Sequence, residues 1–161
     1  AGKSYMWHIA RLATLVAATL TVGLTAGLFV GYACSVMPGL RRTDDRTFFA
    51  AMRAFNVAIL NAWFLVCFVG GLVFTALAAL LHTPAGSRAP LPWLVAGLAL
   101  YAATVIITGR VNVPLNQRLA RPGEPAALRA AFEARWVRWH LVRTVAVAAA
   151  FGCLVGATVA A

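Results

Sequence analysis

The sequence is poor in charge, and acidic residues are especially few. Only 11% of the 161 residues are charged, against 62% that are hydrophobic, and Asp and Glu together number four. A soluble domain carries about 25% charged residues. This shortage argues against a water-soluble globular domain, and it leaves few carboxylates for metal binding or for acid–base catalysis.

Cysteine and histidine are also too scarce and too scattered to form a recognisable metal motif. Cys34, Cys67 and Cys153 all lie in apolar stretches, and their spacing matches no metal-binding pattern. No H-x-x-x-H or E-x-x-H pattern supports the three histidines. We therefore expect the cysteines to serve as small hydrophobic side chains.

Four long apolar segments predict membrane spans. They lie at residues 9–34, within residues 48–81, from about residue 93 to 109, and at residues 141–161. Each offers about 17 or more largely apolar residues, enough for a helix to cross roughly 30 Å of hydrocarbon. We predict an all-α fold, a single integral membrane four-helix bundle over residues 1–161.

The first apolar stretch is long, and no A-x-A-like cleavage pattern follows a short apolar core. We therefore expect no cleaved signal peptide. Met6 is the expected native start, and residues 1–5 are the expected remnant of an added tag.

The distribution of basic residues predicts an orientation. If the four helices alternate in direction, the loops near residues 41 and 121 share one end, which we call the polar end. Of the 14 basic residues, all except Lys3, Arg11 and Arg88 fall at the polar end, as do all four acids. The positive-inside tendency places this end in the cytoplasm and both termini outside the cell's inner membrane. Anionic lipid headgroups explain the excess charge, so nucleic acid is not an expected partner.

Three of the predicted helices are too long for the bilayer. Residues 48–81 contain no proline, and one helix over this range would be about 51 Å long. We predict a continuous helix there, with residues 61–81 in the lipid. The third helix is expected to reach residue 120 and the fourth to begin near residue 127. Helices two, three and four would then extend beyond the bilayer on the cytoplasmic side.

Polar side chains recur where these helices leave the lipid. Each carries a desolvation cost unless it is paired or hydrated, so a cluster at one depth suggests a functional site. The candidate catalytic residues are His140, Arg143, Asn112 and Asn116, and the candidate substrate-binding residues are Arg53, Asn56, Asn61, Trp136 and Arg110. We predict that these groups meet in one chamber.

The local spacing supports this prediction but also allows simpler interpretations. Trp136, His140 and Arg143 share one helical face, and the histidine can accept a proton near neutral pH. The alternative is an interfacial aromatic belt with a snorkelling arginine. Asn112 and Asn116 bracket Pro114, so they either bind a ligand or satisfy the backbone at a proline kink.

Two weaker hypotheses concern metal ions and haem. Asp45 is expected to cap the second helix or to pair with an arginine. It is also a weak candidate metal ligand together with Glu133 and His140, although their spacing matches no motif. A haem bound axially by His140, or by His8 and His82 at the opposite end, is a further alternative.

Glycines recur every four residues in the first and last helices, at Gly23, Gly27 and Gly31 and again at Gly152 and Gly156. Small residues at this spacing let helices approach closely in lipid. We interpret them as packing seams and as a route to a homo-oligomer.

Four segments together resemble the anthrone oxygenase-like family of small four-helix membrane proteins. They are residues 35–40 followed by Asp45, residues 51–61, the Asn-Val-Pro-Leu-Asn element at 112–116, and the Trp-x-x-Trp-His-x-x-Arg element at 136–143. The resemblance covers nearly the whole chain from Met6. It implies an oxygenase that converts anthrones into anthraquinones with O2.

The resemblance also implies roles for the clustered residues. A planar lipophilic aromatic substrate would enter from the lipid and stack on Trp136, with His140 as the base. Arg53, Arg143 and the asparagines would hold the enolate oxygen. The anion would react with O2 directly, without a cofactor, with a haem or a metal ion as the alternative. Two other function classes stay open: a binding or transport protein for a small lipophilic molecule, and a structural membrane subunit.

Overall fold

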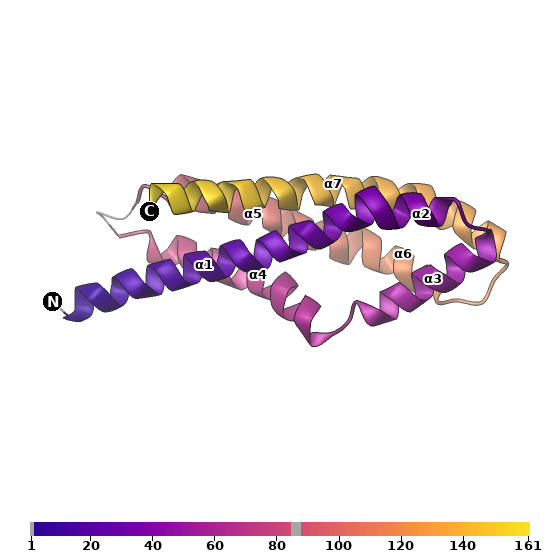
Figure 1. Cartoon of the computed structure of the whole chain (residues 1–161), viewed down its shortest axis with the longest axis horizontal. Coiled ribbons are helices and arrows are strands. Elements are labelled where there is room, and N and C mark those ends of the chain that lie inside the picture. Colours follow the sequence, from indigo (N-terminus) through magenta and orange to yellow (C-terminus); the bar gives the residue numbers. More distant parts are fainter. Residues whose placement is uncertain (1, 85–87) are drawn as a thin grey trace.

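The computed structural model describes residues 2–84 and 88–161, and it consists of helices joined by short turns (Figure 1). In chain order the elements are α1 (Gly2–Gly31), the π-helical turn η1 (Tyr32–Val36), α2 (Met37–Arg41), α3 (Asp45–Ala58), α4 (Ala62–Leu81), α5 (Leu91–Ile107), the π-helical turn η2 (Thr108–Asn112), α6 (Val113–Leu119) and α7 (Pro125–Ala160). The predicted all-α class is confirmed.

Among the described residues, four stretches of helix are long and apolar enough to cross a membrane: Gly2–Arg41, Ala62–Leu81, Leu91–Leu119 and Pro125–Ala160. The chain is therefore a multi-pass membrane protein. α7 has 36 residues, and at 1.5 Å per residue it is about 54 Å long, well beyond a hydrocarbon core of roughly 30 Å. This length fits the predicted extension beyond the bilayer, and the side to which it extends stays a prediction.

The helices pack around two hydrophobic cores. α1 lies against α4 and α7, and α5 lies against α7 and α4. One core, which includes Val22, Tyr101 and Leu154, fills the four-helix region, and the other, which includes Phe48 and Met52, lies where α2, α3 and α6 meet α7. Both termini lie at the end opposite the second core (Figure 1). The polar end therefore has a core of its own.

The predicted continuous helix over residues 48–81 is wrong, because the chain bends between α3 and α4. Asn61 has an extended backbone, and its side-chain Oδ1 accepts a hydrogen bond from the Phe64 N–H at 3.0 Å. Its Nδ2 donates to the Ala58 carbonyl at 2.8 Å. One asparagine thus caps the start of α4 and satisfies a carbonyl at the end of α3. In Figure 1 the resulting corner projects away from α7.

Both π-helical turns end two residues before a proline. The Met37 N–H bonds to the Tyr32 carbonyl before Pro38, and the Val113 N–H bonds to the Thr108 carbonyl before Pro114. A proline ring clashes with the carbonyl four residues earlier, and a wider turn there relieves the clash. The predicted kink at Pro114 is therefore a π-helical turn, and the helix continues to Leu119.

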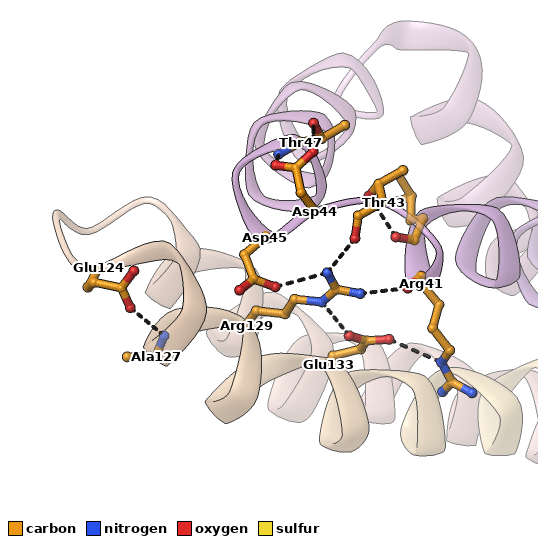
Figure 2. Close-up of polar contacts among 10 residues, drawn as sticks. Arg41, Thr43, Asp44, Asp45, Thr47, Glu124, Ala127, Arg129 and Glu133 are labelled. Atoms are coloured by element: carbon orange, nitrogen blue, oxygen red, sulfur yellow. Dashed lines mark hydrogen bonds and ion pairs between the residues drawn. The ribbon is translucent and has the colours of Figure 1, made fainter.

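A half-buried arginine joins the α2–α3 turn to α7 (Figure 2). Arg129 pairs with Asp45 at 3.0 Å and with Glu133 at 2.7 Å, and it donates to the Thr43 and Arg41 carbonyls at 2.8 and 3.0 Å. Glu133 also pairs with the Arg41 side chain at 3.2 Å. We call these five residues the Arg129 cluster. Of the two predicted roles for Asp45, the structure shows the pairing.

The other two acids cap helices. Asp44 accepts hydrogen bonds from the Thr47 N–H and hydroxyl at 3.0 and 2.6 Å at the start of α3, and these bonds lower the pKa of the Asp44 carboxyl. Glu124 accepts from the Ala127 N–H at 2.9 Å at the start of α7. A carboxylate at a helix N-terminus is favourable because of the helix dipole.

The glycine seams are only partly used within the chain. A Cβ atom at Gly23 would lie 2.8 Å from the Phe151 ring, and one at Gly156 would lie 2.9 Å from the Trp93 ring. Gly27, Gly31 and Gly152 meet nothing within 4 Å of such an atom in the described part of the chain. The homo-oligomer stays a prediction.

Candidate active site

A cavity of about 390 Å³ lies where the two cores meet. Its walls come from α1, η1, α3, α4, η2, α6 and α7. The residues that line it include Phe29, Tyr32, Arg53, Phe55, Asn56, Val57, Leu60, Phe64, Thr108, Val113, Asn116, Gln117, Ala120, Trp136, His140 and Arg143. The wall is mainly apolar and aromatic with a few polar groups, as is typical of small-molecule sites.

Arg143 is the buried cation of this cavity, with 7% of its surface exposed. Its Nη1 donates to the Thr108 hydroxyl at 3.0 Å, and its Nε and Nη2 both donate to Nδ1 of His140, at 3.2 and 3.0 Å. The guanidinium carbon lies 4.3 Å from the centre of the Phe29 ring and 5.5 Å from that of Trp136. All these partners are neutral, so the positive charge is solvated only by dipoles and ring faces.

No carboxylate of the chain is available to neutralise Arg143. The sequence contains four acids, all within the described residues; two cap helices and two belong to the Arg129 cluster (Figure 2). A buried charge without a counter-ion is costly. The cavity therefore presents a fixed positive charge that a bound anion would neutralise.

Both ring nitrogens of His140 are engaged. Its Nε2 lies 3.0 Å from the Phe29 carbonyl oxygen, which only accepts, so Nε2 carries the proton. Nδ1 then holds the lone pair, and it accepts both Arg143 hydrogen bonds. With 1% of its surface exposed, His140 is held as a neutral imidazole in one tautomer. A substrate proton reaches Nδ1 only if Arg143 gives up these hydrogen bonds.

Trp136 lies in a column of rings on α7 and does not offer a free face. It stacks on His140 with ring centres 4.7 Å apart and on Phe132 at 5.8 Å. Its Nε1 donates to Oδ1 of Asn116 at 2.8 Å. The predicted stacking of substrate on Trp136 does not fit this geometry. The rings left for contact with a ligand come from other helices, such as Phe55 and Phe64.

The amide groups near the cavity have unused hydrogen-bonding capacity. The Nδ2 of Asn56, which lines the cavity, is buried and has no partner among the described residues. Because Oδ1 of Asn116 is taken by Trp136, its Nδ2 is the amide group left for a ligand. These two amide groups and the guanidinium of Arg143 are all hydrogen-bond donors. The cavity therefore matches a ligand that is rich in acceptor oxygens.

Not every residue of the predicted cluster lines the cavity. Arg53, Asn56, Asn116, Trp136, His140 and Arg143 do. Asn112 lies behind the wall, where its Nδ2 donates to the Trp136 carbonyl at 3.4 Å and its buried Oδ1 has no partner in the described structure. Arg110 is exposed and does not line the cavity, and the exposed Asn61 is the cap of α4. Asn61 and Arg110 are therefore not brought to the site.

A comparison with known protein families matches a region that includes part of this cavity. The profile of the family described as anthrone oxygenase matches residues 62–153. The chain belongs to this family. No curated protein and no solved structure matched the chain. The matched region of this anthrone oxygenase family member runs from α4 into α7 and contains Asn116, Trp136, His140 and Arg143, whereas the walls from α1 and α3 lie outside it.

The weak metal hypothesis for this family member finds no support in the geometry. Asp45 and Glu133 both bind Arg129, and His140 lies seven residues beyond Glu133, roughly 10 Å further along α7. Among the described residues, no three His, Cys, Asp or Glu side chains are grouped as a metal site. A haem iron bound by His140 would have to displace the Phe29 carbonyl or Arg143. These residues therefore do not fit either group in this arrangement.

Sequence reasoning missed several residues of the site. Phe29, Tyr32, Phe55 and Phe64 read as ordinary apolar positions, and Thr108 as a polar residue within a span. One signal was available: Tyr32 and Thr108 each stand six residues before a proline, at the first position of a π-helical turn. Both side chains line the cavity. π-helical turns are frequent at functional sites.

Proposed function

We propose that this protein is a membrane oxygenase that binds a planar, lipophilic, anthrone-like substrate as its enolate and oxidises it with O2. The observation that carries the proposal is Arg143, a buried cation without a carboxylate partner in a mainly apolar, aromatic cavity. Membership of the anthrone oxygenase family supports the reaction type. We choose an anthrone-like substrate because it is a carbon acid whose deprotonated form, the enolate, carries negative charge on oxygen.

The cavity suits such a ligand in size and polarity. A volume of about 390 Å³ lies within the range of small-molecule sites. Phe55, Phe64 and Tyr32 supply aromatic contacts for a flat ring system. The enolate oxygen would bind Arg143, and the amide donors of Asn56 and Asn116 would bind further oxygens of the substrate.

The reaction begins with loss of a proton from the CH2 group that lies between the substrate's two aromatic rings. In the proposal, Arg143 turns its donors from Nδ1 of His140 to the substrate oxygen, and Nδ1 accepts the proton. The enolate between the two side chains then separates the imidazolium from the guanidinium. Donors placed where the negative charge develops lower the barrier for this step.

The enolate carbon then supplies the electrons that reduce O2. A C–O bond forms in one-electron steps, and the proton held by His140 converts the peroxide anion into a hydroperoxide. Loss of the second proton from the same carbon forms the C=O bond, the O–O bond breaks, and the departing hydroxide takes a proton to become water. In sum, CH2 and O2 give C=O and H2O. We propose this route without a cofactor, because the anion itself is the reductant.

The sidedness of the molecule is part of the proposal. We propose that the polar end lies in the cytoplasm and that both termini lie outside the inner membrane. The support is the distribution of basic residues, of which only Lys3, Arg11 and Arg88 lie at the terminal end. The cavity would then lie near the inner leaflet.

The test is O2 consumption by purified protein in liposomes on addition of an anthrone, with the quinone measured in parallel. We expect one O2 consumed per quinone formed. Arg143→Gln should lower the rate by about 10²–10³-fold, the usual effect of losing an oxyanion donor. Arg138→Gln, an exposed arginine on the same helix, should leave the rate unchanged. Tight binding of the anthrone without O2 consumption would overturn the proposal in favour of a binding protein.

A further inference from the structure

The mouth of the cavity can be located from the lining residues that are exposed. On one side they are Val57 and Leu60 at the α3–α4 corner, with 76% and 68% of their surfaces exposed. On the other side they are Val113, Gln117 and Ala120, on or next to α6. The cavity therefore opens sideways, between the corner and α6, rather than along the bundle axis.

The depth of this mouth follows from α4. This helix has 20 residues, which at 1.5 Å per residue match a hydrocarbon core of roughly 30 Å. Its first residue follows the Asn61 cap, so the corner lies at the boundary between hydrocarbon and headgroups. Trp63, in the first turn, is 85% exposed, as expected for an aromatic residue at a membrane interface.

The chemistry of the rim fits the same depth. Val57, Leu60 and Trp63 form an exposed apolar lip, which would be unfavourable in water and is favourable in lipid. Beside it, the exposed Arg53 lines the cavity, and its guanidinium lies 5.3 Å from the centre of the Phe49 ring. No carboxylate of the described residues pairs with Arg53. The mouth therefore combines an apolar lip with one cation.

We propose that the cavity opens laterally into the membrane at its headgroup boundary, and that its ligand enters from the bilayer between the α3–α4 corner and α6. Lipid covers Val57 and Leu60, and Arg53 meets the ligand's oxygen before Arg143 does. The identity of the ligand rests on the proposed function, whereas the contact with lipid does not. The route depends on the break in the second span at Asn61, since a continuous helix would not form the corner.

The lipid contact is tested without any activity measurement. A nitroxide label is placed at Leu60→Cys in liposomes, with Cys34, Cys67 and Cys153 replaced by alanine. Its collision rates with O2, which concentrates in lipid, and with a water-soluble nickel chelate are compared. We expect O2 to dominate at Leu60→Cys and the nickel chelate to dominate at Arg121→Cys, an exposed position in the α6–α7 loop. Dominance of the nickel chelate at both positions would overturn the proposal.

The entry route is tested by a substitution at the lip. Leu60→Asn should raise KM for an anthrone several-fold with little change in kcat, because entry from lipid is impeded while the inner site is intact. Leu80→Asn, at an equally exposed apolar position at the other end of α4, should change neither value. Equal effects of the two variants would contradict entry at the corner. A protein without oxygenase activity would refute the proposed function, and the label measurement would still decide the position of the mouth.

Discussion

His140 accepts two hydrogen bonds from Arg143 through a single ring nitrogen, Nδ1, at 3.0 and 3.2 Å. The two residues are three apart on α7 and therefore lie on the same face of the helix. The Nδ1 lone pair of His140 is occupied by the hydrogen bonds from Arg143, and His140 in turn provides part of the solvation of the buried cation. They form one unit, and a substrate oxyanion that draws Arg143 away exposes the lone pair of His140.

The two roles of His140, as base and as partner of Arg143, predict different outcomes for two substitutions. His140→Gln retains an acceptor for Arg143 but no basic nitrogen, so we expect substrate binding to persist while kcat falls by about 10²–10⁴-fold. His140→Ala removes both roles and should weaken binding as well. Binding isotherms and O2 uptake measure the two effects. Wild-type turnover in His140→Gln would show that His140 is not the base.

The Arg129 cluster should matter for stability and not for the reaction. Arg129→Ala removes two ion pairs and two hydrogen bonds to backbone carbonyls, so we expect the free energy of unfolding to fall by roughly 2 kcal/mol. Arg135→Ala, at an exposed position on the same helix, should change it by less than about 0.5 kcal/mol. Thermal unfolding in detergent measures both. Similar values for the two variants would mean that the cluster contributes little.

Gly71 is required by the close approach of α4 and α5. A Cβ atom at this position would lie 2.7 Å from the hydroxyl of Tyr101, which donates to the Phe68 carbonyl at 2.8 Å. Gly71→Ala should therefore destabilise the bundle by about 1–3 kcal/mol through overpacking. Gly27→Ala, with no atom within 4 Å of the new Cβ, should not destabilise it. Destabilisation by Gly27→Ala instead would indicate that this face is packed against a second copy.

The cap at Asp44 predicts a pH dependence. The pKa of its carboxyl is lowered in the folded state, so its contribution to stability is complete above the ordinary pKa and is lost as the pH falls through the lowered value. Asp44→Asn keeps an acceptor for Thr47 but does not titrate in this range. The wild type should therefore lose more stability than Asp44→Asn on acidification, as measured by thermal unfolding across this range. Identical acid profiles would argue against the cap.

The fold class and much of the site could be predicted from the sequence, because hydrophobic run length and polar residues within apolar segments have direct physical meaning. The α3–α4 corner could not, since Asn61 reads equally as a buried polar residue or as a helix cap. The orientation of Trp136 could not be predicted either, because helical spacing places it beside His140 without showing that Phe132 covers its other face. That Arg143 has no carboxylate partner could not be predicted either, because this conclusion requires knowing the partners of all four acids.

The central claim is that Arg143 binds the substrate as an anion, and an anaerobic spectroscopic titration tests it most directly. Without O2 the reaction stops at the enolate, whose absorption differs from that of the neutral anthrone. We expect the wild-type protein to show the enolate spectrum of bound ligand at neutral pH, and Arg143→Gln to show the neutral form. Neutral ligand in both proteins, or the enolate in both, would contradict the claim.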